Sequence, residues 1–228
     1  MMIGFVMTTN AAESASSHPD FQTIRSETLN PDSKYYYPNL LKAFLSNDTT
    51  MTDDDYYYFY YGSMFQEDYN PYRPNPFADE LKATAPLYSH HGHLSRSEKN
   101  QILNLAEKSL AHNPFNLMQM SHLVYAYNEL GKTNLASIWQ HKLNHLLLTI
   151  ARSGTGADQE HAIVVVDPSN EFDFFILSKR TVVGQEYFEP YYDCLTVQTP
   201  GAKDSKKYWF DLHHVLEQYY DKHPGEQQ

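Results

Sequence analysis

Apolar residues recur with a helical period from about residue 31 to residue 152. Thr52 and Asp55 have the three-residue spacing of a capping box, which predicts that a helix begins there. The segment before it has the spacing i, i+3, i+4, i+7, i+8, which places apolar side chains on one face of a helix. The five residues of that set are Tyr37, Leu40, Leu41, Phe44 and Leu45.

The helix that follows Thr52 is aromatic on every face. Positions 56–61 hold five tyrosines and one phenylalanine. Such a helix is either contacted from several sides or forms one face of a groove. Because large aromatic side chains are mostly buried in folded proteins, we expect the first arrangement.

Three more helices are predicted between residues 95 and 152. Ser95 and Glu98 form a second capping box, and Pro114 ends the helix that begins there. Gly131 is the predicted C-cap of the next helix. The third runs from about Asn134 to Arg152.

The period changes after residues 152–158, whose Gly, Ser and Thr content is typical of a linker. Short β-branched or aromatic runs behind it predict four strands and one final helix, capped by Asp211. Because the connections between these strands are short, we expect antiparallel pairing. The predicted strands cover residues 162–166, 172–177, 194–197 and 207–210.

These elements predict an α+β protein in three segments. Residues 1–18 would be a disordered leader or the remnant of a signal peptide. Residues 19–152 would form a helical domain, and residues 159–228 a small antiparallel sheet with one C-terminal helix.

The chain of 228 residues has 17 basic and 28 acidic side chains, which gives a net charge of −11. This charge repels phosphate backbones, so we expect no nucleic-acid partner. No run approaches the roughly 20 apolar residues that a transmembrane helix needs. The single cysteine, Cys194, excludes an internal disulfide framework and is expected to be a buried, inert thiol in a strand.

The first residues resemble the second half of a secretory signal peptide. A short apolar run is followed by small residues, and Thr9 and Ala11 have the −3 and −1 spacing of a cleavage site. A positively charged start is missing, because the first basic residue is Arg25. We therefore expect a periplasmic or secreted protein with a truncated signal peptide, and a cytoplasmic protein is the alternative.

The proline-rich loop around residues 65–77 holds the candidate ligand-binding residues, which are Tyr69, Tyr72 and Arg73. Its prolines restrict the backbone, so little conformational entropy is lost on binding. Tyrosine and arginine often anchor interfaces. The alternative is that the tyrosines fill a gap between helices and bond their hydroxyl groups to the backbone.

Histidine spacing suggests metal binding at two places, but we expect no metal and no cofactor. His141 and His145 are four residues apart on a helix, yet both point away from the apolar stripe around Trp139. A third ligand is absent from the nearby sequence. A second cluster, His90, His91 and His93, lies in a predicted loop.

Two sets of motifs resemble known families. Asn113-Pro114, Leu123, Tyr127, Leu130-Gly131 and Ala136 resemble about one and a half tetratricopeptide repeats, although Val124 stands where that repeat prefers glycine. Four motifs taken together resemble a family of gut Bacteroidales proteins with a domain of unknown function. This second resemblance implies an exported bacterial protein and assigns no activity. The motifs are Tyr36-Tyr37-Pro38-Asn39-Leu40-Leu41, Tyr60-Tyr61-Gly62, Glu67-Asp68-Tyr69-Asn70-Pro71-Tyr72 and Tyr208-Trp209-Phe210-Asp211.

The functional hypothesis is a non-enzymatic, exported interaction or ligand-binding module with an unknown protein or peptide partner and no catalytic residue. The alternative is a hydrolase with a carboxylate or histidine site at the junction of the two halves, for which Glu67, Asp68, His90 and His91 are the candidates. Two carboxylates, or a histidine and a carboxylate, that converge in an enclosed pocket favour the hydrolase. An open aromatic groove favours the binding module.

Overall fold

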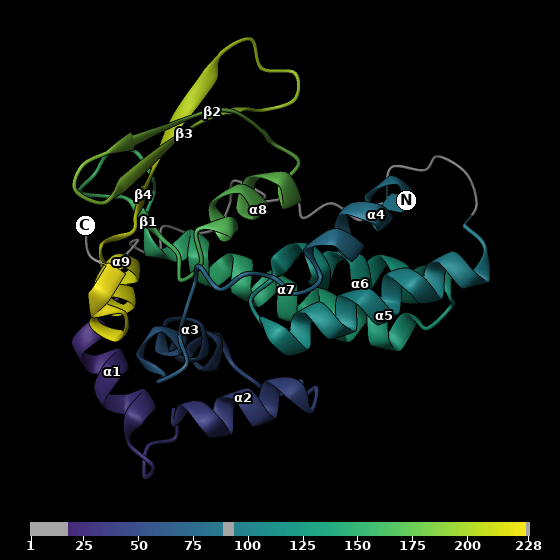
Figure 1. Cartoon of the computed structure of the whole chain (residues 1–228), viewed down its shortest axis with the longest axis horizontal. Coiled ribbons are helices and arrows are strands. Elements are labelled where there is room, and N and C mark those ends of the chain that lie inside the picture. The colour runs from purple at the N-terminus through teal and green to yellow at the C-terminus, as the bar shows by residue number, and fades with distance from the viewer. Residues whose placement is uncertain (1–17, 89–93, 227–228) are drawn as a thin grey trace. The chain divides into compact units, whose positions relative to one another are not determined.

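The computed structural model describes residues 18–88 and 94–226 and divides the chain into two compact units (Figure 1). The first unit contains residues 72–144, and the second combines residues 18–71 with residues 145–226. The proposed leader, except for His18, and the cluster of His90, His91 and His93 lie outside the described residues.

The first unit is helical. It contains α4 (Ala78–Tyr88), α5 (Arg96–His112), α6 (Leu117–Glu129) and the first part of α7 (Thr133–Ser153). The predicted capping box is confirmed at α5, where the Ser95 N–H donates to Glu98 Oε2 at 2.7 Å and the Glu98 N–H to Ser95 Oγ at 3.2 Å. Gly131, with a φ of +72°, follows α6 as predicted.

The helices of the second unit are α1 (Phe21–Leu29), α2 (Tyr37–Leu45), α3 (Asp53–Gly62) and α9 (His213–Lys222), with the short helices η1 (Ser63–Phe65) and η2 (Pro224–Glu226). The box of Thr52 and Asp55 caps α3 as predicted. A Cβ on Gly62 would lie 2.5 Å from Thr28 Cγ2, so this glycine lets α3 approach α1 closely.

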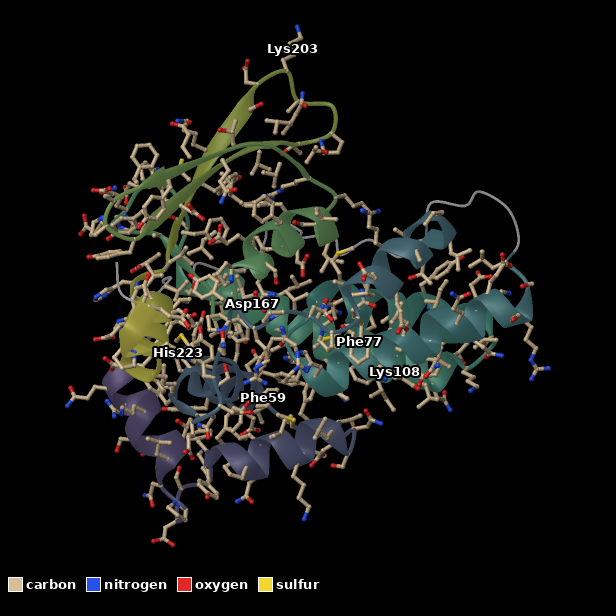
Figure 2. The ribbon with its side chains drawn as sticks, in the orientation of Figure 1. Phe59, Phe77, Lys108, Asp167, Lys203 and His223 are labelled. Atoms are coloured by element: carbon tan, nitrogen blue, oxygen red, sulfur yellow. The ribbon has the colours of Figure 1, made fainter. Side chains whose placement is uncertain are left out.

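The aromatic helix α3 is contacted from several sides, as expected. Tyr56, Phe59, Tyr60 and Tyr61 are each 0% exposed. Phe59 lies among the side chains around α3 (Figure 2), and its ring packs against those of Tyr37 and Phe44 at 5.6 and 4.8 Å between centroids. The core of the second unit is therefore built on aromatic rings.

The sheet has the order β1-β4-β3-β2, with β1 (Ile163–Val164), β2 (Thr181–Phe188), β3 (Tyr192–Gln198) and β4 (Ser205–Asp211). β2, β3 and β4 form an antiparallel meander, of which β3 and β4 were predicted and β2 was not. The expectation of a wholly antiparallel sheet is wrong, because β1 pairs with β4 in parallel. β1 is separated from β4 by α8, β2 and β3, so the short-connection argument does not apply to this pair.

Residues 172–177 form part of a helix, α8 (Ser169–Leu177), and the strand predicted there is wrong. Asp167 forms a turn that leads into the helix, because its Oδ1 accepts hydrogen bonds from the Ser169 N–H at 2.9 Å and from Ser169 Oγ at 2.7 Å. A short apolar run does not by itself separate a strand from a buried helix. The apolar pattern does not predict β2, because most residues of this strand are exposed, as is typical of an edge strand.

The two units do not follow the expected boundary after Arg152, because residues 18–71 belong to the same unit as the sheet. Tyrosine hydroxyl groups of α3 connect these segments. Tyr60 Oη donates to Asn170 Oδ1 at 2.7 Å and accepts from the Val166 N–H at 3.2 Å. Tyr61 Oη donates to the Val164 carbonyl at 3.2 Å. These bonds satisfy polar groups that would otherwise be buried without partners.

Candidate functional site

An open groove of about 510 Å³ lies between α1, η1 and α9 in the second unit. Its apolar part is formed by two aromatic rings and one leucine, and Leu29 is 45% exposed. Polar and charged side chains line the rest. The residues that line the groove are Phe21, Gln22, Arg25, Ser26, Leu29, Phe65, His214, Glu217, Gln218 and Asp221.

Phe21 is positioned by local capping and by ring contacts. Asp20 caps α1, because its carboxylate accepts from the Thr23 N–H at 3.1 Å and from Thr23 Oγ1 at 2.6 Å. The Phe21 ring lies 3.9 Å from the His214 ring and 6.4 Å from the Phe65 ring, measured between centroids. The rings of Phe21 and Phe65 form the aromatic floor of the groove. The His214 ring, from the other end of the described chain, packs against Phe21.

Charges of both signs surround this floor. His214 Nδ1 lies 2.8 Å from Glu217 Oε2 on the next turn of α9. The Arg25 guanidinium lies 6.0 Å from the centroid of the Phe65 ring. Asp221 supplies a further acidic group. The groove can therefore hold an apolar side chain of a ligand and bond to polar groups beside it.

Tyr69 has the surroundings expected if the tyrosines of the proline-rich loop fill a gap and bond their hydroxyl groups to the backbone. It is half-buried, its hydroxyl donates to the Val166 carbonyl at 2.6 Å, and Lys222 Nζ lies 5.3 Å from its ring centroid. Tyr72 is 45% exposed and Arg73 is also exposed. The described residues that line the groove include none of these three.

Sequence reasoning did not single out the groove. Its α1 segment carries a signal that could have been used, because Asp20 is a good N-cap and Phe21, Ile24 and Thr28 recur at helical spacing. Its other wall, α9, was predicted, but nothing in the sequence says that these two helices meet. Their contact depends on tertiary packing.

Two carboxyl groups come together elsewhere in the second unit, at Glu171 on α8 and Asp193 on β3. Glu171 is 0% exposed and Asp193 is 7% exposed. Burial, followed by the charge of Asp193, raises the pKa of Glu171 well above its usual value. Gln185 Nε2 donates to Asp193 Oδ2 at 2.9 Å. This pair is shielded from solvent, whereas Glu67 and Asp68 are exposed.

His145 does not point into solvent, and that prediction is wrong. Its side chain is 22% exposed, its Nδ1 lies 2.7 Å from Asp53 Oδ1, and its ring stacks on Tyr56 with centroids 4.7 Å apart. His141 is likewise half-buried. The angle measured from Trp139 identifies one apolar face of α7 but does not reveal that α3 covers a second face around His145.

Three further features predicted from the sequence can be compared with the structure: metal binding, the single thiol and membrane-spanning helices. Within residues 18–88 and 94–226, no group of three or more His, Cys, Asp or Glu residues is placed to hold a metal ion. Cys194 is fully buried as expected, and burial raises the pKa of its thiol. None of the helices in the described part of the chain has the length and apolar character to cross a membrane.

The fold and the groove define an α+β protein with a mixed four-stranded sheet, whose candidate site is an open aromatic groove. A family model described as Domain of unknown function (DUF4919) matches residues 22–221, and the chain belongs to this family. No curated protein and no solved structure matches the chain. The matched range includes every residue that lines the groove except Phe21.

Proposed function

We propose that this protein is a non-enzymatic interaction module that binds a peptide segment of a partner protein in the groove between α1, η1 and α9. The observation that carries the proposal is the aromatic floor of Phe21 and Phe65 beside the 45%-exposed Leu29. An apolar surface of this kind gains free energy when a partner covers it.

A peptide fits the size and the charges of the groove. Its volume of about 510 Å³ lies in the range of about 300–1,000 Å³ that is usual for ligand sites. One apolar side chain of the peptide would contact Phe21 and Leu29. Arg25 and Asp221 would interact with polar or charged groups on either side of that anchor.

The surroundings of the carboxyl groups favour binding over hydrolysis. A hydrolase needs an acid and a base that reach the substrate. The converging pair of Glu171 and Asp193 is buried, and it lies outside the groove. The groove holds the pair of His214 and Glu217, 2.8 Å apart, together with Asp221, but it is open rather than enclosed, which favours binding.

Panning a random peptide library against the protein tests the proposal. We expect enriched peptides to contain an apolar anchor and to lose at least tenfold in affinity for the variant Leu29→Asp. Leu45→Asp is the matched control, because Leu45 also ends a helix, is 59% exposed and does not line the groove. Failure to enrich peptides, or equal binding by both variants, would contradict the proposal.

The exported location is part of the same proposal and rests on the sequence of the first twelve residues. Expression of the chain with its natural upstream region in a bacterial host, followed by fractionation, tests it. Recovery of the whole protein in the cytoplasm would contradict export and would leave the groove proposal untouched.

A further inference from the structure

The first turn of α8 contains a buried acid, Glu171, and the charged groups that act on it are acidic. Glu171 is 0% exposed, and neither of its carboxyl oxygens has a hydrogen-bond partner among the described residues. The charged groups that act on it are Asp193 on β3 and Asp167 in the turn before α8. Asp167 is labelled in Figure 2. An ionised Glu171 would therefore be desolvated next to two negative charges.

A proton removes this conflict. Two ionised carboxylates can only accept hydrogen bonds, whereas a protonated carboxyl group supplies an O–H donor to its neighbour. Asp193 already accepts a hydrogen bond from Gln185 Nε2 at 2.9 Å, and its carboxylate oxygens can accept a further one from a protonated Glu171.

The pair lies where α8 packs against the sheet. Phe175 of α8 contacts Tyr208 and Phe210 of β4, with ring centroids 4.9 and 5.9 Å apart. Asp193 is the direct cross-strand neighbour of Phe210, so its side chain lies on the same face of the sheet as these rings. Asn170, next to Glu171, binds Tyr60 of α3.

We propose that Glu171 carries a proton beside Asp193 in the folded protein and that this proton makes the packing of α8 on the sheet dependent on pH. With the proton bound, α8 is held against β3 and β4. When the proton leaves, the buried negative charges repel and α8 separates from the sheet more often. This inference does not depend on the groove or on its ligand.

The sign of the pH dependence follows from linkage. The pKa of Glu171 is raised in the folded protein, so the stabilising effect of its proton is complete below the unfolded value of about 4.5. This stabilising effect decreases as the pH rises from about 4.5 through the folded pKa of Glu171. Between these two values, the equilibrium constant for opening of α8 should rise about tenfold per pH unit, as expected for the loss of one proton.

Native-state hydrogen exchange of the α8 amides tests the proposal, with exchange rates divided by the intrinsic rate at each pH. In the wild-type protein we expect opening of α8 to increase with pH from about pH 5 upward. In Glu171→Gln this increase should be lost. The control Glu67→Gln removes an exposed acid of the same unit and should keep the wild-type profile.

Two further measurements keep the test decisive if Glu171→Gln does not fold. Infrared spectra of the wild-type protein should contain a protonated-carboxyl band that persists above the ordinary carboxyl pKa of about 4.5 and disappears as the pH rises further, together with increased exchange in α8. Asp193→Asn should narrow the pH window over which opening rises, because it removes the neighbouring charge. Opening of α8 that is independent of pH in the wild-type protein would overturn the proposal.

Discussion

Tyr69 and Tyr72 are only three residues apart in the proline-rich loop, yet their side chains have different surroundings. Tyr69 is half-buried and donates its hydroxyl to the Val166 carbonyl at 2.6 Å, whereas Tyr72 is 45% exposed. Tyr69 therefore fits the explanation that the loop fills a gap in the fold, and Tyr72 fits the explanation that the loop presents a ligand-binding surface. Tyr69 attaches it to the fold, and Tyr72 with Arg73 remains a candidate surface for a ligand.

This difference predicts unequal losses of stability. Tyr69→Ala should lower the free energy of unfolding by about 3 kcal/mol, because it removes ring contacts and leaves a carbonyl without its donor. Tyr72→Ala should cost less than about 1 kcal/mol, as exposed substitutions usually do. Urea denaturation of both variants measures the two values. A large loss at both positions would mean that the whole loop is scaffolding.

At the scale of elements, α3 determines which segments belong together. Its tyrosine hydroxyl groups bond to the Val164 carbonyl, the Val166 N–H and the Asn170 side chain, which precede or begin α8. Because these polar groups are buried, losing their bonds to α3 costs free energy. A helix that is far away in sequence therefore fixes the position of β1 and the start of α8.

Removing one hydroxyl group of α3 tests this role. Tyr60→Phe should lower the free energy of unfolding by about 2–4 kcal/mol, because it removes two buried hydrogen bonds, one to Asn170 Oδ1 and one from the Val166 N–H. Tyr57→Phe is the control on the same helix, since its hydroxyl accepts only an exposed N–H of Asp20, at 3.2 Å. Thermal and urea melts that give equal losses for the two variants would contradict this account.

At the scale of the whole molecule, the sheet is not an independent C-terminal domain. It shares its unit with residues 18–71, which precede the first unit in sequence. Tyrosine hydroxyl groups of that early segment bond to polar groups of β1, of α8 and of the turn between them. A domain boundary drawn at the linker alone separates groups that bond to one another.

We therefore predict that the fragment from Gln159 to Gln228 does not fold by itself. Its amide NMR spectrum should have the narrow dispersion of an unfolded chain, because α3 is absent. A comparison chain, in which a flexible Gly-Ser linker joins residues 18–71 to residues 145–228, should give a dispersed spectrum. A folded fragment, or an unfolded comparison chain, would show that the second unit is wrongly delimited.

The sequence alone determined the features that depend on neighbouring residues. Both capping boxes join residues that are three positions apart. The pairs Thr52–Asp55 and Ser95–Glu98 therefore predict where their helices begin without information from the rest of the chain. The burial of the aromatic helix α3 follows from the absence of a polar face. The α+β class follows from the change of period after residue 158.

Tertiary structure decided the rest, because the interactions involved join distant residues. The run at 172–177 is helical in α8, where one face packs on β4 and the Ser169 N–H at the start of the helix donates to Asp167. The groove exists because Phe21 and His214, from opposite ends of the described chain, meet at 3.9 Å. Glu171 and Asp193 are ordinary acids in sequence. Only burial of both between α8 and β3 makes the charge of one depend on the other.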